Sequence, residues 1–140
     1  MSMDCVFCKI RDGAIPSAKV YEDQRTFAIM DINPLSPGHC LVITKHHAAT
    51  LFEAAEADLA AAITAAQRVG TAVRAALKAD GLNMLQANGA AAFQSVPHFH
   101  LHLIPRFMND GKGFDWKQVP GNREEVVANV EKIKAALGGP

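Results

Sequence analysis

Polar and apolar residues alternate most regularly between residues 98 and 104. Three of the six histidines, His98, His100 and His102, occupy every second position there. A period of two is typical of a β-strand, in which residues two apart share a face. The pattern therefore predicts a strand with an imidazole row on one face and a core on the other. The apolar residues that would face this core are Phe99, Leu101 and Leu103.

Shorter runs of β-branched and apolar residues predict further strands. A polar turn separates the first two runs and indicates a hairpin, and a segment rich in proline and glycine precedes the third. The strands predicted from these runs are 18–21, 26–32, 39–44 and 81–88.

Apolar residues at steps of three and four predict two helices. The first is alanine-rich and spans about residues 50–79, where Thr50 and Glu53 have capping-box spacing and Gly81 would cap the end. The second spans 122–137 and begins at an asparagine cap. Its apolar stripe consists of Val126, Val130, Ile133 and Leu137.

The chain of 140 residues has the length of one compact domain. We expect a single domain over 1–140, with its core in 5–106 and the second helix over 122–137. The segment 107–121 contains the only tryptophan and reads as a long loop, and loops of this length are usually functional or mobile.

Charge and composition argue against two kinds of partner. Fourteen basic and fourteen acidic residues are mixed along the chain, without the basic stripe that binds a nucleic-acid polymer. The first residues lack a secretory pattern, and no stretch approaches about twenty apolar residues. We therefore expect a soluble, cytoplasmic protein that contacts no membrane.

The cysteines suggest metal or redox chemistry near the start of the chain. Three cysteines are too few for a disulfide framework, whereas Cys5-x-x-Cys8 has the spacing of a metal or redox pair. This pair lies in a segment, 5–15, that reads as a short helix or turn. Cys40 lies in an apolar run and is expected to be a buried small hydrophobe.

The imidazole row permits more than one chemistry. Neighbouring members lie about 6.7 Å apart along a strand, so all three cannot easily share one zinc ion, although His98 and His100 could. Alternatively, one neutral imidazole attacks phosphorus while its neighbours donate hydrogen bonds and fix its tautomer. A third interpretation is a solvated face with no chemical role.

The histidine strand resembles the signature of the histidine triad (HIT) family of nucleotide hydrolases and transferases, in particular its Hint-like, zinc-containing bacterial members. The resemblance covers about residues 5–106. It implies an α+β fold with a five-stranded antiparallel sheet, one long helix and a C-terminal helix, and a homodimer with a continuous sheet. The similar segments are Cys5-Val6-Phe7-Cys8-Lys9-Ile10, Asp31-Ile32, Pro37-Gly38-His39, Asn88-Gly89 and Gln94-Ser95-Val96.

The resemblance implies an enzyme that cleaves at the α-phosphate of a purine nucleotide derivative. His100 would be the nucleophile and would form a nucleotidyl-histidine that water hydrolyses. His39 and His102 would support it, and Ser95 would protonate the leaving atom. Asp31 would bind the ribose hydroxyls. Phosphate donors would be Asn88, Gln94 and Ser95, and the base would lie among Val6, Phe7, Ile10, Ile29 and Ile32.

A structural zinc ion is also implied by the resemblance. Its ligands would be Cys5, Cys8, His47 and His98, a closed tetrahedral set without an open position. His46 would face solvent instead. An empty dithiol remains the alternative for the two cysteines.

Several alternative interpretations of the function remain. The chain could be a dinucleoside polyphosphate hydrolase, a nucleotide-binding interaction protein with incidental turnover, or a metal-dependent enzyme that uses His98 and His100. Asn88-Gly89 could simply form a turn. Two residues depart from the family pattern: Phe93 stands where glycine is frequent, and Pro97 stands directly before the histidines. The loop around Trp116 would close over the partner subunit's site.

Overall fold

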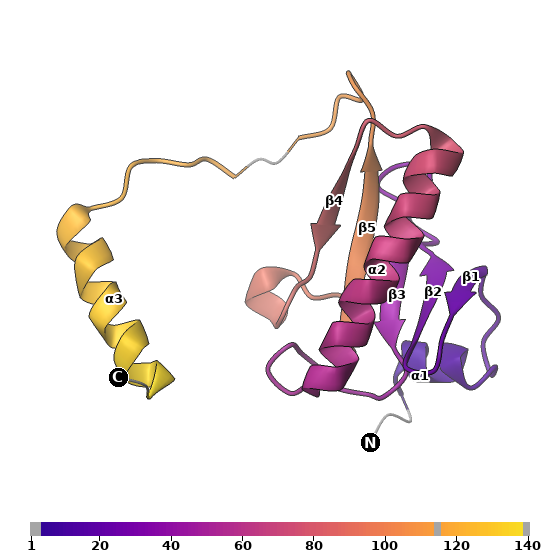
Figure 1. The fold of residues 1–140 in the computed structure, drawn as a ribbon, viewed down its shortest axis with the longest axis horizontal. Helices are drawn as coiled ribbons and strands as arrows, with labels where there is room; N and C mark the ends of the chain where they lie inside the picture. The colour runs from indigo at the N-terminus through magenta and orange to yellow at the C-terminus, as the bar shows by residue number, and fades with distance from the viewer. Residues whose placement is uncertain (1–3, 114–115, 139–140) are drawn as a thin grey trace. The chain divides into compact units, whose positions relative to one another are not determined.

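The computed structural model describes residues 4–113 and 116–138 (Figure 1). These residues divide into two units, one ending at Asp110 and one beginning at Gly111. The first unit carries all the strands and the residues that we assigned to chemistry. None of the described helices is long and apolar enough to cross a membrane. The single domain expected over 1–140 stays a prediction.

Five antiparallel strands form one sheet in the order β1-β2-β3-β5-β4. The predicted five-stranded α+β fold is thereby confirmed. The central strand β3 is buried throughout, and the histidine strand β5 lies beside it (Figure 1). The strands are β1 (Lys19–Glu22), β2 (Thr26–Met30), β3 (Cys40–Thr44), β4 (Gly81–Leu85) and β5 (His100–Arg106).

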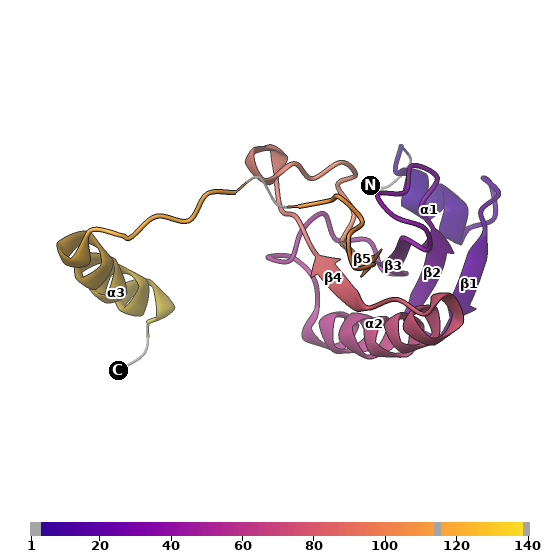
Figure 2. The ribbon, with the colours of Figure 1, turned by 90° about the horizontal axis from the view of Figure 1, so that it is seen from above.

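Helices pack on opposite faces of the sheet, as Figure 2 shows for α1 (Val6–Arg11) and α2 (Glu56–Leu77). Phe99, Leu101 and Leu103 belong to the core under α2. The alternation along β5 therefore turns the histidines to the side of α1. A second core on that side joins Phe7 and Cys8 to residues of β2 and β3.

The ends of the long helix differ from those predicted. The helix α2 begins at Glu56, after Ala55, so the capping box at Thr50 and Glu53 is wrong. The Thr50 hydroxyl accepts a hydrogen bond from the Phe52 N–H and stabilises a turn before the helix instead. At the other end Lys78, with φ 55°, takes the left-handed cap position that we assigned to Gly81. Gly81 is instead the first residue of β4.

Several strands are shorter than their apolar runs. β2 ends at Met30 and β4 at Leu85, and β5 begins at His100 rather than His98. The residue before β5, Phe99, donates its N–H to the Ala48 carbonyl instead of to a neighbouring strand. Proline at position 97 fits this irregular approach, because it cannot donate to a neighbouring strand.

In the second unit, α3 (Arg123–Leu137) begins where predicted. The Asn122 side chain caps it by accepting a hydrogen bond from the Glu125 N–H. The predicted apolar stripe is present but exposed within this unit: Val126, Val130, Ile133 and Leu137.

Candidate functional site

A cavity of about 340 Å³ lies between α1 and the histidine face of the sheet. It brings together most of the residues that the sequence assigned to nucleotide binding, from α1, the end of β2, β5 and the segment before β5. The predicted residues in its lining are Val6, Phe7, Ile10, Ile29, Asp31, Ile32, Ser95, His100 and His102.

His100 lies against this cavity with a defined tautomer. Its Nδ1 is 2.6 Å from the backbone carbonyl oxygen of His98. A carbonyl can only accept, so Nδ1 carries the proton, and Nε2 of the neutral ring keeps its lone pair. No described residue hydrogen-bonds Nε2. The ring of Phe7 contacts the imidazole edge to face, with centroids 4.9 Å apart, and helps to fix its orientation.

His39 and His102 form a short hydrogen-bonded relay. The Leu35 N–H donates to His39 Nδ1 over 3.0 Å, so the proton of the neutral ring lies on Nε2. That Nε2–H is 3.0 Å from His102 Nδ1 and donates to it. His102 consequently carries its own proton on Nε2, for which the described part of the chain offers no acceptor. The relay makes His102 a hydrogen-bond donor beside His100, whose Nε2 is an acceptor without a partner among the described residues.

The carboxylate of Asp31 follows β2 at the edge of the cavity. Its Oδ1 accepts a hydrogen bond from the Asn33 N–H over 2.8 Å, which fixes the side chain on a turn. Its Oδ2 lies 3.5 Å from His39 Nε2. Both oxygens keep lone pairs that a hydroxyl donor can use.

Burial keeps the imidazoles of His39, His100 and His102 neutral. It lowers the pKa of His102 to about 4, an effect to which the neighbouring His100 and His39 add. Burial also lowers the pKa of His100 and of His39, against the opposing charge of Asp31. Since the ordinary histidine pKa is about 6.5, all three rings are predominantly neutral at pH 7.

Two predicted phosphate donors lie outside the cavity lining. Asn88 Oδ1 accepts from the Leu51 N–H over 2.7 Å, and its amide nitrogen donates to Gln86. Gln94 donates to the Ala49 carbonyl over 2.6 Å and accepts from the Gly89 N–H. Both side chains thus join loops, and their role in phosphate binding stays a prediction. Phe93, which departs from the family pattern, is 86% exposed.

Some of the cavity wall was missed in the sequence. Much of it comes from the irregular segment that joins α1 to β1, which carries no periodic signal. Asn33 could have been suspected from its place two residues after an aspartate, a spacing typical of an Asx turn. The missed lining residues are Ile15, Pro16, Ser17, Ala18, Met30, Asn33, Leu41 and Val96.

Beside this cavity, the structure brings together Cys5, Cys8, His47 and His98. His98 Nδ1 lies 3.2 Å from Cys5 Sγ, 3.5 Å from Cys8 Sγ and 3.1 Å from His47 Nδ1. Tetrahedral zinc at its usual bond lengths separates two nitrogens by about 3.3 Å and a nitrogen from a sulfur by about 3.5 Å. The spacing of the four atoms therefore fits one zinc ion. His46 is exposed.

The tautomer of His98 supports the same conclusion. Its Nε2 is 2.7 Å from the Thr44 carbonyl oxygen and must donate to it. Nδ1 then keeps a lone pair that points into the cysteine cluster, as a metal ligand requires. Such a second hydrogen bond to a backbone carbonyl is usual for histidines that bind zinc. These residues could hold a metal ion.

The chain is similar to one known protein family and to several individual proteins. The family model described as HIT domain matches residues 12–109. "Protein hit" of Bacillus subtilis is 44% identical over 115 residues, which are 81% of this chain and 79% of that protein. "Adenosine 5'-monophosphoramidase hnt1" of Schizosaccharomyces pombe is 38% identical over 96% of this chain and 99% of its own. "Adenylylsulfatase HINT3" of Arabidopsis thaliana is 45% identical over 76% of this chain and 54% of its own.

Solved structures of other proteins have the same fold as this chain. SMU.412c from Streptococcus mutans has a TM-score of 0.91 and 37% identity, over 96% of this chain and 86% of that one. A histidine triad family protein from Mycobacterium smegmatis, described as zinc-bound, has a TM-score of 0.77 and 38% identity, over 97% of this chain and 99% of that one. The match to the family model and the similarity to these relatives show that the chain belongs to the HIT domain family.

Proposed function

We propose that the protein is a nucleotide hydrolase that cleaves at the α-phosphate of a purine nucleotide derivative through a covalent intermediate on His100. The orientation of His100 carries the proposal. Its Nδ1–H is held by a backbone carbonyl, and its Nε2 lone pair is left for the cavity. A neutral imidazole of this kind is a nucleophile at neutral pH without a separate base.

In the first step His100 Nε2 forms a bond to the α-phosphorus while the bond from phosphorus to the leaving group breaks. His102 Nε2–H donates to a phosphate oxygen as charge builds up there. The Ser95 hydroxyl, in the cavity lining, gives a proton to the leaving atom. In the second step water attacks phosphorus, the P–Nε2 bond breaks, and the water proton restores Ser95. The products are a nucleoside 5′-monophosphate and the protonated leaving group.

The cavity offers suitable contacts for the rest of a nucleotide. Its walls contain Phe7, Ile10 and Ile29, which can cover a flat purine on both faces. Asp31 lies at the same cavity and presents acceptors for ribose hydroxyls. Its volume of about 340 Å³ is in the lower part of the range of small-molecule sites, roughly 300–1,000 Å³.

The leaving group is open within this proposal. One relative is named an adenosine 5'-monophosphoramidase and another an adenylylsulfatase. Both names indicate a substrate with an adenylyl group, but the group attached to it differs. The mechanism needs only an α-phosphorus beside His100. A dinucleoside polyphosphate is a third candidate substrate for the same step.

We assign the cysteine–histidine cluster a structural role. Zinc bound by Cys5, Cys8, His47 and His98 would supply a covalent link between α1 and the sheet and no chemistry at phosphorus. The alternative of a metal-dependent enzyme that uses His98 and His100 together is less well supported. His98 Nδ1 faces the cysteines, and His100 Nδ1 is already engaged by the His98 carbonyl.

We also propose a homodimer that pairs at β4. This strand is the edge of the sheet next to β5, and its outer hydrogen-bonding groups have no strand partner among the described residues. Leu82 and Met84 on this strand are 37% and 49% exposed. An exposed edge with apolar side chains favours pairing with a second copy. The cytoplasmic location stays a prediction.

Hydrolysis of a purine nucleoside 5′-phosphoramidate tests the proposal. The native protein should release the nucleoside monophosphate, and His100→Gln should lose turnover by at least about 10³-fold while it keeps its fold and nucleotide affinity. His46→Gln, which changes an exposed histidine outside the cavity lining, is the matched control and should remain active. Equal turnover by the native protein and His100→Gln would contradict the proposal and favour an interaction protein with incidental turnover.

A further inference from the structure

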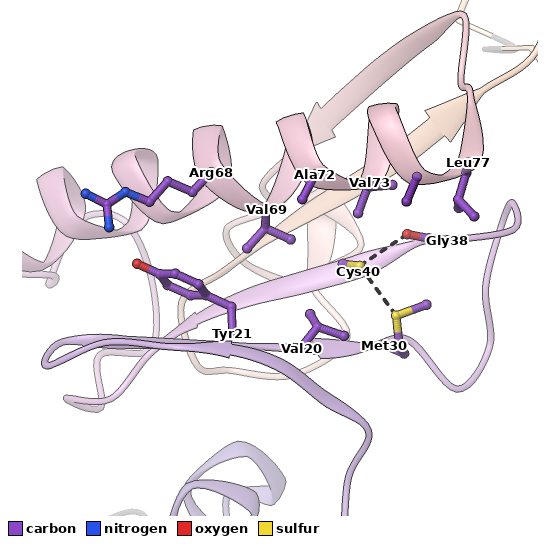
Figure 3. Close-up of a pocket in the computed structure, with 11 residues that line it drawn as sticks. Val20, Tyr21, Met30, Gly38, Cys40, Arg68, Val69, Ala72, Val73 and Leu77 are labelled. Carbon is purple, nitrogen blue, oxygen red and sulfur yellow. Dashed lines mark hydrogen bonds between the residues drawn. The ribbon is translucent and has the colours of Figure 1, made fainter.

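A second cavity, of about 320 Å³, lies on the opposite face of the sheet from the catalytic histidines, between α2 and the strands β1 to β3 (Figure 3). Met30 is the one residue that contributes to the lining of both cavities. The walls of the second cavity are almost entirely apolar. Six residues make up most of them: Val20, Met30, Cys40, Val69, Val73 and Leu77.

The cavity lies between α2 and the sheet, with Val20 and Tyr21 of β1 at one end. At its other end Gly38 lies against Leu77. Gly38 has a φ of +88°, and a Cβ at this position would overlap the Leu77 side chain. Val20 and Leu77 remain 51% and 43% exposed, so the cavity is open and its apolar walls lose solvent contact only when it is filled.

A cation without a partner lies at the β1 end of the cavity. Figure 3 shows the side chain of Arg68, on α2, extending toward the hydroxyl end of Tyr21, and both residues line the cavity. Arg68 makes no hydrogen bond or ion pair with any residue in 4–113 or 116–138. The nearby carboxylate of Asp23 accepts from the Tyr21 hydroxyl and from groups of Arg25 and Thr26. Its acceptor sites are therefore in use, and Arg68 keeps its donors for a ligand.

We propose that this cavity binds a small aliphatic carboxylate of roughly eight carbon atoms, with its chain among the apolar walls and its carboxylate on Arg68. The volume is near the lower end of those of small-molecule sites, which suits a single short chain. A guanidinium binds a carboxylate by two parallel hydrogen bonds, and an apolar lining with a few polar groups is the usual composition of such sites. The proposal is independent of the chemistry at His100.

The single tyrosine of the chain provides a direct probe. In protein with ¹³C-labelled tyrosine rings, titration with octanoate should shift the one Tyr21 ring signal to saturation. Octanoate should bind about 15-fold more tightly than hexanoate, since each buried methylene contributes about fourfold in affinity. 1-Octanol should bind more weakly than octanoate because it lacks the charge.

Two variants separate the cavity from other surfaces. Arg68→Gln should reduce the affinity for octanoate about tenfold and leave that for 1-octanol unchanged. Ala72→Phe, which places a ring in the cavity wall, should abolish binding of both. The matched control is Arg74→Gln, on the same helix but outside this lining, which should bind octanoate as the native protein does.

A Tyr21 signal that does not move, or that drifts without saturation, would overturn the proposal. Equal affinities for octanoate and 1-octanol would overturn the assignment of Arg68 as the anion site. Binding by Ala72→Phe at native affinity would place the ligand elsewhere.

Discussion

The His39–His102 relay gives a prediction that separates a chemical role from a packing role. His39 is 1% exposed and donates its Nε2–H to His102 Nδ1 over 3.0 Å. In His39→Asn the amide oxygen can replace Nδ1 as the acceptor for the Leu35 N–H, but the shorter side chain no longer reaches His102. In His39→Gln the longer amide can place an N–H near the position of Nε2.

The expected size of the effect follows from the loss of one neutral hydrogen bond. Such a bond contributes about 0.5–1.5 kcal/mol, and about 1.4 kcal/mol corresponds to a tenfold change in rate. His39→Asn should therefore lower kcat/KM by about 2- to 12-fold through the relay alone. His39→Gln should retain more activity than His39→Asn, although both disturb packing.

The assay is kcat/KM with a purine nucleoside 5′-phosphoramidate, with urea unfolding to compare the stabilities of the two variants. The ¹⁵N shifts of His102 report its tautomer, which a packing defect alone would not change. The native protein should show the proton on Nε2, and His39→Asn should show a mixture. Native kcat/KM in His39→Asn, or an unchanged His102 tautomer, would refute the relay.

Three further predictions concern metal binding, pH and backbone strain. Purified protein should contain about one zinc per chain, and Cys8→Ser should lose this zinc and unfold at a lower temperature. Native protein that contains no zinc after growth in zinc-supplemented cells would argue against the site. The acid limb of kcat/KM should lie below pH 6.5, because protonation of His100 removes the lone pair that attacks phosphorus and burial lowers the pKa of this ring. An acid limb at or above pH 6.5 would contradict this. Gly38→Ala should lower the free energy of unfolding, measured in urea, by at least about 1–2 kcal/mol, since alanine is strained at φ +88° and its Cβ would overlap Leu77. An unchanged urea midpoint would be inconsistent with this geometry.

The sheet could be predicted largely from periodicity. The alternation of histidines with Phe99, Leu101 and Leu103 identifies both the strand and the face that it buries, because a strand has only two faces. The boundaries were less predictable. Whether the long helix begins at residue 50 or at Glu56 depends on turn hydrogen bonds of Thr50 that local spacing does not reveal.

The residues of the candidate site and their expected roles followed from the resemblance to the HIT family, whereas the histidine tautomers could not be predicted. The tautomers of His98 and His100 are fixed by backbone carbonyl groups of Thr44 and His98, and backbone groups carry no sequence signal. The loop contacts of Asn88 and Gln94 likewise depend on which segments meet in three dimensions. The resemblance already implied that His98 binds metal while His100 and His102 act at phosphorus, and the structure adds the hydrogen bonds that support this division.

Chemical trapping of the covalent intermediate on His100 is the decisive test of the mechanism. Protein mixed briefly with a nucleoside 5′-phosphoramidate labelled in the nucleoside should be quenched in base and digested for mass spectrometry. The account predicts one acid-labile nucleotidyl group on His100, attached through Nε2 and absent from His100→Gln. Label on another residue, or full turnover by His100→Gln, would contradict it.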